Sequence, residues 1–300
     1  MSLSRFRSRQ TLNRVWPPKI CMRTCGFVLF HVNRTASFNY FFGAMTDFFF
    51  ISSPPLPRPW ADFSYDDFMN RSGGLLINGG RSSRVFRFVD KEGACYLKRY
   101  TYNKIHWRYC WQKSQARQEY ENLEKLKQTS LGCSTIEILA FGEKRDGRIL
   151  RSAFILSREV AGSQRLSLFL DENQSPKRKP VIDKIVRFGA QLIRSGLALN
   201  DLYFRNILVI PESAEIYLLD VQHCALNRKR ARLKTYPQLW SDILLYFTPD
   251  EQAWAAARLK AELPYNLKEL RHRAEKFLPR EKKRKAAELA YAKKIEELQT

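Results

Sequence analysis

The sequence has few of the features that mark metal-binding, disulfide-rich or membrane-spanning proteins. Its six cysteines do not have the spacing of a zinc site, and we interpret Cys21 and Cys25, four residues apart, as incidental. The apolar stretch from Cys25 to Val32 ends at Asn33 and Arg34 and is too short to span a bilayer. These absences favour a reducing, cytosolic setting.

Acidic residues are scarce and unevenly distributed. The 300 residues include 52 Lys and Arg against 30 Asp and Glu, a formal net charge of +22, which predicts an anionic partner or surface. The first 44 residues contain seven basic residues, no acidic residue and no regular apolar pattern. We interpret residues 1–44 as a leader that is disordered or foreign to the native protein, with Met45 as the natural start; a signal peptide is the alternative.

The most informative motif combines two aspartates and an asparagine. Asp201 precedes Asn206 by five residues, and Asp220 follows Asn206 by fourteen. The apolar runs 207–210 and 216–219 predict a hairpin that places Asn206 and Asp220 at the same end. This layout is typical of the catalytic and metal-binding loops of kinases. It predicts phosphoryl transfer, with Asp201 accepting the acceptor's proton and Asn206 and Asp220 as magnesium ligands.

Upstream residues supply two further parts of a kinase site, in the order that a kinase requires. Lys98 lies on a predicted strand over residues 94–100 and is our choice for the phosphate-binding lysine. On the helix expected from about Trp111 to Lys127, Glu119 falls on the apolar stripe. Because a buried carboxylate needs a cation, we expect Glu119 to pair with Lys98. This order disfavours the alternative of two ordinary turn aspartates.

Two segments are expected to complete the nucleotide site. A hairpin is predicted over residues 77–88, although it lacks the full glycine-rich signature. We assign its small turn residues to the nucleotide: Gly79, Gly80, Ser82 and Ser83. The apolar strand over residues 152–160 breaks at Gly162, and the backbone of Glu159 and Val160 is expected to contact adenine. Taken alone, each segment equally fits an ordinary β-turn or core strand.

Residues from about 73 to 247 resemble the lipopolysaccharide kinase (Kdo/WaaP) family, a bacterial branch of the protein-kinase-like fold. The segments with the strongest resemblance are 96–100, 116–123, 140–143, 154–159, 196–208 and 219–222. The family usually has histidines in the helix before the catalytic loop and just before its aspartate, where this chain has Arg194 and Leu199-Asn200.

The resemblance implies an α+β, two-lobed protein-kinase-like fold. A small N-lobe of antiparallel sheet plus helix is expected at 73–160, after a lead-in at 45–72 whose proline-rich part, residues 46–59, is expected to be loosely ordered. A larger helical C-lobe is expected at 161–263, followed by a basic helical tail at 264–300, which we expect to be solvated or to lie along a membrane surface.

The resemblance also implies the chemistry. The cofactors would be ATP and Mg²⁺, and the acceptor a heptose or Kdo hydroxyl of the lipopolysaccharide inner core. The alternatives are a kinase with a protein or small-molecule acceptor, and a non-catalytic kinase-like binding protein.

Basic clusters indicate the expected partners. They occur at 177–179, 228–234 and 282–285 and could bind the lipopolysaccharide core oligosaccharide or lipid A-core, and the anionic surface of the inner membrane. This predicts a peripheral protein on the cytoplasmic face of the bacterial inner membrane. A nucleic-acid partner is disfavoured, because the aromatic residues lie mainly within apolar runs.

Overall fold

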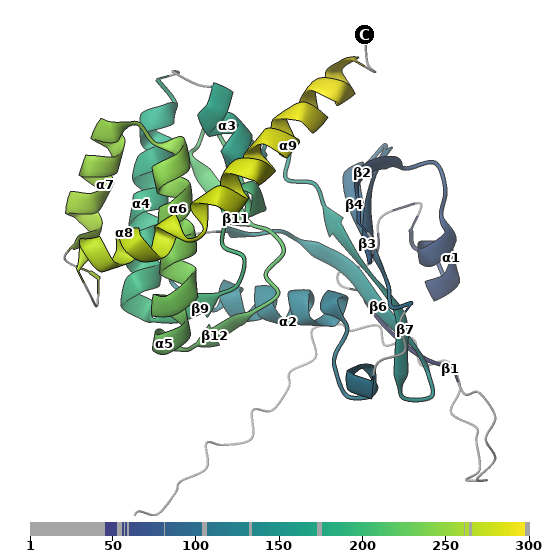
Figure 1. The fold of residues 1–300 in the computed structure, drawn as a ribbon. Helices are drawn as coiled ribbons and strands as arrows, with labels where there is room; N and C mark the ends of the chain where they lie inside the picture. The colour runs from purple at the N-terminus through teal and green to yellow at the C-terminus, as the bar shows by residue number, and fades with distance from the viewer. Residues whose placement is uncertain are drawn as a thin grey trace, which may run out of the picture.

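The computed structural model describes residues 46–52, 56, 58, 60–80, 82–103, 107–131, 134–172, 176–260, 262–263 and 266–297. The predicted leader at 1–44 lies outside these residues, as do Cys21, Cys25 and Cys133. The described chain forms a smaller lobe built on a sheet and a larger, mostly helical lobe (Figure 1). The α+β, two-lobed architecture expected from the sequence is therefore confirmed.

The N-lobe is built on a six-stranded antiparallel sheet with the order β1-β6-β7-β4-β3-β2. Its strands are β1 (Thr46–Ser52), β2 (Leu75–Gly79), β3 (Ser83–Asp90), β4 (Gly93–Thr101), β6 (Ile138–Asp146) and β7 (Ile149–Arg158). Helix α2 (Gln115–Lys127) packs against β6 and β7. Strand β4 lies between β3 and β7, so a residue in its middle is held on both sides.

Alternation along β4 sends neighbouring side chains to opposite faces of the sheet. Lys98 points toward α2, whereas Arg99 donates to the carbonyl groups of Phe68 and Arg71, at 2.8 and 2.6 Å. These carbonyls belong to helix α1 (Tyr65–Asn70) and its C-cap. The two faces of the sheet are therefore covered by different helices.

The segment before residue 73, which we expected to be a lead-in that is loosely ordered over residues 46–59, contributes a strand and a helix to the N-lobe. Strand β1 pairs with β6 along its whole length. Trp60 is fully buried, and its ring lies 5.7 Å from that of Phe68 and 5.3 Å from that of Phe88. The expectation rested on the prolines of this segment. Its aromatic residues instead provide an apolar face that covers the sheet.

The C-lobe is organised around helix α4 (Arg178–Ser195), which buries an apolar stripe. Helix α4 ends at Gly196, whose left-handed φ of +68° suits a glycine C-cap. The other helices are α3 (Leu166–Glu172), α5 (Arg228–Arg230), α6 (Tyr236–Tyr246), α7 (Pro249–Lys260), α8 (Leu267–Glu275) and α9 (Leu278–Glu297), and η1 (Trp107–Cys110), η2 (Phe204–Asn206) and η3 (Ala231–Thr235) are short helical turns.

Two small sheets pack against the helices of the C-lobe. One contains β5 (Ser134–Thr135), β11 (Glu215–Leu218), β10 (Ile207–Ile210) and β8 (Gln164–Arg165), in that order. The other pairs β9 (Leu197–Leu199) with β12 (Cys224–Leu226). The segment after α4 and the segment after β11 therefore lie side by side.

One side of the first half of helix α9 packs on the C-lobe, while most residues of this half are exposed. Glu281 is 3% exposed and forms an ion pair with Arg205, and Lys285 pairs with Asp171. The remainder of α9 extends past the C-lobe (Figure 1). None of the helices in the described ranges is long and apolar enough to cross a membrane.

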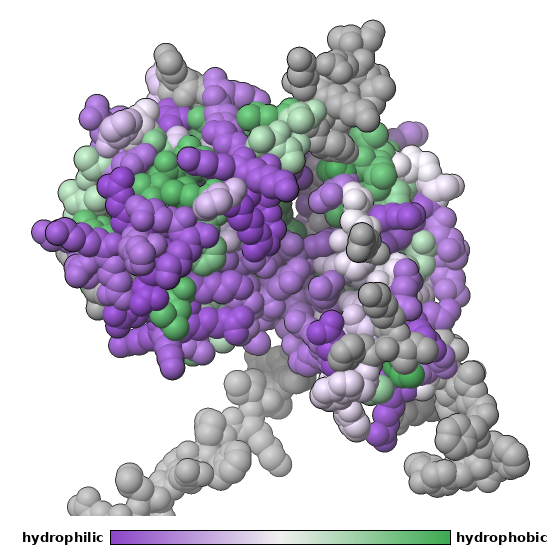
Figure 2. Space-filling view, in the orientation of Figure 1, coloured by the Kyte–Doolittle hydropathy of each residue, from purple (hydrophilic) through white to green (hydrophobic). Residues whose placement is uncertain are grey.

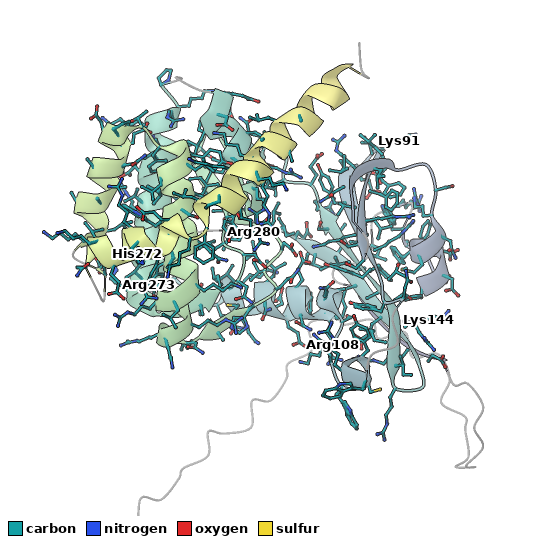
Figure 3. The ribbon with its side chains drawn as sticks, viewed as in Figure 1. Lys91, Arg108, Lys144, His272, Arg273 and Arg280 are labelled. Carbon is teal, nitrogen blue, oxygen red and sulfur yellow. The ribbon has the colours of Figure 1, made fainter. Side chains whose placement is uncertain are left out.

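The visible surface is largely hydrophilic (Figure 2). A hydrophobic patch lies over β2, where Leu75 and Leu76 are exposed. Basic side chains occur on both lobes: Lys91, Arg108 and Lys144 on the N-lobe, and His272, Arg273 and Arg280 on the C-lobe (Figure 3). The excess positive charge is thus spread over the molecule.

Candidate active site

The predicted hairpin after Asn206 is present. Strands β10 and β11 pair antiparallel, with Ile207 opposite Leu218. The Leu219 N–H donates to the Asn206 carbonyl oxygen at 2.8 Å, which closes the open end of the hairpin. Asn206 and Asp220 therefore lie at the same end, as the sequence predicted.

Lys98 joins three segments that are far apart in the sequence. Its Nζ lies 2.7 Å from Asp220 Oδ1 and 3.2 Å from Glu119 Oε2. The Tyr100 hydroxyl donates to the same Glu119 oxygen at 3.0 Å. The predicted Lys98–Glu119 pair is therefore formed in the structure. The Asp220 contact links the N-lobe to the C-lobe.

The charges of Lys98, Glu119 and Asp220 depend on one another. Burial alone would lower the pKa of Lys98, but the neighbouring carboxylates outweigh it and hold that pKa well above its ordinary value. Burial raises the pKa of Glu119, and Lys98 offsets this shift in part. For Asp220, burial opposes ionisation, but Lys98 lowers the pKa below its ordinary value. Lys98 and Asp220 are therefore both charged near neutral pH.

Asp201 lies in the loop between α4 and β10, next to Asn206. The Asn206 side-chain Nδ2 donates to the Asp201 carbonyl oxygen at 2.8 Å, and both residues line the same small cavity. Asp201 and Asp220 have φ of 54° and 52°, and Ala214 is the third non-glycine residue with positive φ in the described chain. Left-handed backbone at non-glycine residues is strained and often occurs at functional sites.

Helix α6 supports this loop from beneath, a role that sequence reasoning missed. Asp242 is 2% exposed and accepts the Phe204 N–H at 2.5 Å. The Thr235 hydroxyl accepts the Leu199 N–H at 3.1 Å and donates to the Leu199 carbonyl at 2.8 Å. An acidic residue inside the apolar run 239–244 was the available signal, because such a residue needs a buried partner.

Helix α2 also holds the segment after Asp220. Asn122, one turn beyond Glu119 on the buried stripe, donates from Nδ2 to the Val221 carbonyl at 3.1 Å. Asn122 could have been found from the sequence, because it follows Glu119 by three residues and so lies on the same face of the helix. Tyr100, in phase with Lys98 on β4, could have been found in the same way.

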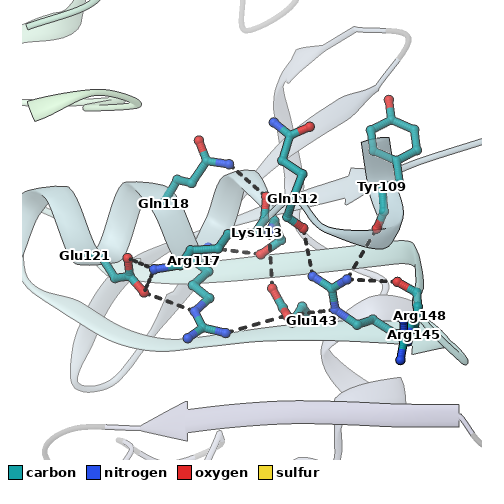
Figure 4. A network of polar contacts seen from close by, with 10 residues as sticks. Tyr109, Gln112, Lys113, Arg117, Gln118, Glu121, Glu143, Arg145 and Arg148 are labelled. Carbon is teal, nitrogen blue, oxygen red and sulfur yellow. Dashed lines mark hydrogen bonds and ion pairs between the residues drawn. The ribbon is translucent and has the colours of Figure 1, made fainter. Parts of the chain in front are cut away.

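A polar network fixes the N-terminal end of α2 (Figure 4). The helix begins after Ser114 rather than near Trp111, because the Ser114 hydroxyl caps it by accepting the Arg117 N–H. The buried Glu143 accepts the Ser114 N–H at 3.2 Å and pairs with Arg145 at 3.1 Å. This network orients the helix that presents Glu119.

The predicted glycine turn lies at one end of β4. Gly80 N–H donates to the Ser83 carbonyl at 2.8 Å, and Ser83 is opposite Tyr100 in the sheet. Neither Gly79 nor Gly80 has positive φ, and an added Cβ would contact nothing closer than 3.7 Å at either position. The fold itself therefore does not require glycine there. The assignment of Gly79, Gly80, Ser82 and Ser83 to the nucleotide stays a prediction.

Glu159 and Val160 lie at the opposite end of β4. The Glu159 N–H donates to the Ala94 carbonyl at 2.8 Å, and the Val160 carbonyl accepts the Ser163 N–H at 3.1 Å. The remaining C=O and N–H groups between Glu159 and Val160 belong to one peptide and point in opposite directions. At most one of them can face an adenine from this peptide.

The Glu159 side chain has a partner that the sequence did not predict. Arg87 donates to both of its carboxylate oxygens at 2.8 Å, and the Tyr96 hydroxyl donates at 2.9 Å. The Arg87 hydrogen bonds are the main cause of a lowered Glu159 pKa. The carboxylate therefore braces β3, β4 and the end of β7 rather than joining the Lys98 cluster.

The donor set at Asn206 and Asp220 fits Mg²⁺. Because Asn206 Nδ2 is bonded to Asp201, the amide oxygen is the group left to bind a cation. Mg²⁺ prefers such oxygen ligands and usually shares them with water and substrate phosphates. No group of three His, Cys, Asp or Glu that could hold a metal occurs within the described ranges, so the ion would need the nucleotide as a further ligand.

Comparison with known proteins identifies the family. A family model described as the lipopolysaccharide kinase (Kdo/WaaP) family matches residues 78–256, more than half of the chain. No curated protein matches the sequence significantly.

A search of solved structures found similar chains. WaaP in complex with acyl carrier protein has 20% identity and a TM-score of 0.50, over 78% of this chain and 98% of that chain. A Toxoplasma gondii rhoptry antigen kinase domain has 13% identity and a TM-score of 0.34, over 51% and 49% of the two chains. The WaaP likeness supports a kinase-like fold. Since the family model spans most of both lobes, the chain belongs to the lipopolysaccharide kinase (Kdo/WaaP) family.

Proposed function

We propose that this protein transfers the γ-phosphoryl group of ATP to a heptose or Kdo hydroxyl of the lipopolysaccharide inner core. The observation that carries the proposal is the contact of Lys98 with both Glu119 and Asp220, at 3.2 and 2.7 Å. A lysine on an N-lobe strand, a helical glutamate and an aspartate after a C-lobe hairpin are the parts that orient a nucleotide in kinases.

Each residue has a defined role in this proposal. Lys98 binds the α- and β-phosphates, and Glu119 holds Lys98 in position. Asp201 orients the acceptor hydroxyl and accepts its proton. Asn206 and Asp220 hold Mg²⁺, which neutralises charge on the phosphates when it is bound. The Lys98 ammonium holds the Asp220 carboxylate at 2.7 Å.

The partners follow from charge and family. A net charge of +22 favours lipid A-core and the anionic cytoplasmic face of the inner membrane as binding surfaces. Because the similar WaaP structure is a complex with acyl carrier protein, we add an acyl carrier protein as a candidate partner of this chain. Co-purification with and without that protein would test this addition.

The test of the proposed function is transfer of ³²P from γ-labelled ATP to purified inner-core oligosaccharide. We expect label on the sugar with Mg²⁺ present, and none when Asp201 is replaced by Asn. Matched reactions would offer a protein mixture or free sugars as acceptors. Labelling of those acceptors alone would indicate a different kinase, and nucleotide binding without any transfer would indicate a non-catalytic protein.

A further inference from the structure

Three cations near the loop of Asp201 lack acidic partners. Lys125 lies on α2, which packs against β12; Arg230 lies in α5; and Lys234 lies in η3, which packs against β9. We call these three residues the cation cluster. Many Lys and Arg side chains elsewhere in the protein form ion pairs, such as Arg87 with Glu159 and Arg178 with Glu251. Within the part of the chain that the structure describes, no member of the cation cluster has a carboxylate within ion-pair distance.

The fold brings this cluster to the catalytic loop. Strand β12 pairs with β9, so the chain that follows β12 starts beside the chain that follows α4. Arg230 then donates from Nε and Nη2 to Asn200 Oδ1, at 3.2 and 3.0 Å. Asn200 is the residue immediately before Asp201. Arg230 is therefore tethered next to the proposed proton acceptor.

Arg230 also has donors to spare. A guanidinium group has five N–H donors in a fixed fork, and the described structure uses one from Nε and one from Nη2. The remaining three suit a carboxylate or phosphate, which bind arginine through two parallel hydrogen bonds. Because the side chain is held by Asn200, less conformational entropy is lost when an anion binds.

We propose that the cation cluster binds an anionic group of the acceptor, a sugar carboxylate or a sugar phosphate, and so positions the reacting hydroxyl at Asp201. The inference rests on the proposed function for the identity of the acceptor. It adds a requirement that the proposed chemistry does not contain: the accepted sugar must bear a negative charge close to the hydroxyl that is phosphorylated.

The test measures binding of fluorescently labelled inner-core oligosaccharide in the presence of ADP, so that no turnover is needed. Arg230→Ala should weaken binding about tenfold, as expected for the loss of a charge-assisted fork. Arg258→Ala is the matched control, because Arg258 is an exposed arginine on α7, outside the basic clusters that are expected to bind the acceptor. We expect Arg258→Ala to change binding less than twofold.

Chemically altered oligosaccharides separate the two sources of the anion. Reducing the carboxylates or removing the phosphates should weaken binding to the wild-type protein, and the effective treatment identifies the group. The same treatment should have little further effect on Arg230→Ala, because both changes remove one interaction. Equal losses for Arg230→Ala and Arg258→Ala, or wild-type binding that neither treatment alters, would overturn the inference.

Inorganic phosphate is a second probe that does not depend on the sugar. With ADP occupying the nucleotide site, phosphate titration should shift the NMR signals of the Arg230 guanidinium and the Asn200 amide in the wild-type protein. Absence of both phosphate shifts and oligosaccharide binding would overturn the cation cluster as an anion site. Phosphate shifts without oligosaccharide binding would support the site and count against the proposed acceptor instead.

Discussion

At the scale of single residues, the site depends on two aspartates with unusual backbone. Asp201 and Asp220 have left-handed φ of 54° and 52°, a conformation that aspartate and asparagine adopt more readily than most side chains. Replacement by alanine would therefore add backbone strain to the loss of the carboxylate. Asparagine is the better substitution, because it removes the charge and tolerates the conformation.

Substitutions of the two aspartates should impair different steps, turnover for Asp201 and nucleotide binding for Asp220. Asp201→Asn should lower turnover by about 10²- to 10⁴-fold, the range for loss of a general base, with ATP binding unchanged. Asp220→Asn should weaken binding of ATP with Mg²⁺, because a metal ligand and a partner of Lys98 are both altered. Calorimetry and turnover on the oligosaccharide would measure these effects. Full turnover by Asp201→Asn would contradict its assignment as the proton acceptor.

Lys98 and Glu119 should behave as a coupled pair. Replacing Lys98 removes the cation beside the buried Glu119, and replacing Glu119 leaves Lys98 with Asp220 as its remaining ion-pair partner. Since both changes disrupt the same pair, the double variant Lys98→Met/Glu119→Gln should be little worse than the worse single variant. Lys98→Met should be the more damaging, since Lys98 also contacts Asp220.

A double-mutant cycle on turnover would test this coupling. Glu124→Gln is the control, because Glu124 lies on the same helix and pairs with Lys127 on the exposed side. Strictly additive losses from Lys98 and Glu119 would show that the pair does not act as a unit.

At the scale of elements, the catalytic loop is held from two sides. Helix α6 binds its backbone through Asp242 and Thr235. Helix α9 reaches it through Glu281, which pairs with Arg205, one residue before Asn206. The Arg205 guanidinium in turn lies 4.1 Å from the ring centroid of Tyr203. The C-terminal helix is therefore part of the support of the site.

Glu281→Gln should loosen that support. Because Glu281 is 3% exposed and Arg205 would lose its charged partner, we expect a loss of about 2 kcal/mol in the free energy of unfolding and reduced turnover. ATP binding should change little, since Lys98 is not involved. Glu275→Gln, which alters an exposed pair with Arg271, is the control. Thermal unfolding and turnover that match this control would show that α9 does not support the loop.

At the scale of the whole molecule, the main feature is the excess of positive charge. The full chain has a net charge of +22, to which the seven basic residues among the first 44 contribute, and basic residues lie on both lobes (Figure 3). Such a surface attracts an anionic membrane at a distance set by the ionic strength, about 10 Å at 0.1 M salt. Attraction of this kind would concentrate the protein where lipid A-core is present.

Binding to vesicles should therefore depend on lipid charge and on salt. We expect sedimentation with vesicles that contain phosphatidylglycerol, little with pure phosphatidylcholine, and release from the anionic vesicles as salt rises from 0.05 to about 0.5 M. Equal binding to both vesicle types, or binding that salt does not weaken, would argue for a hydrophobic contact instead, for which the exposed Leu75 and Leu76 would be the first residues to examine.

The sequence pattern was sufficient to predict the placement of residues that are close together in the sequence or that lie on one helical stripe. The hairpin that aligns Asn206 with Asp220 spans few residues, and its alternating apolar runs set its register. The stripe of α2 singled out Glu119 because a carboxylate at a buried position needs a cation. The sequence by itself therefore determined the two-lobed class, the family resemblance and the residues that meet at Lys98.

Tertiary structure decided which residues that are far apart in the sequence contact one another. Arg87 with Glu159, Phe204 with Asp242 and Arg205 with Glu281 are separated by 72, 38 and 76 residues. An arginine or glutamate gives no sign of its distant partner, because many pairings satisfy the same charge. Which pairing forms depends on how sheets and helices pack around one apolar core, and that packing placed α9 on the catalytic loop and Arg230 beside Asp201.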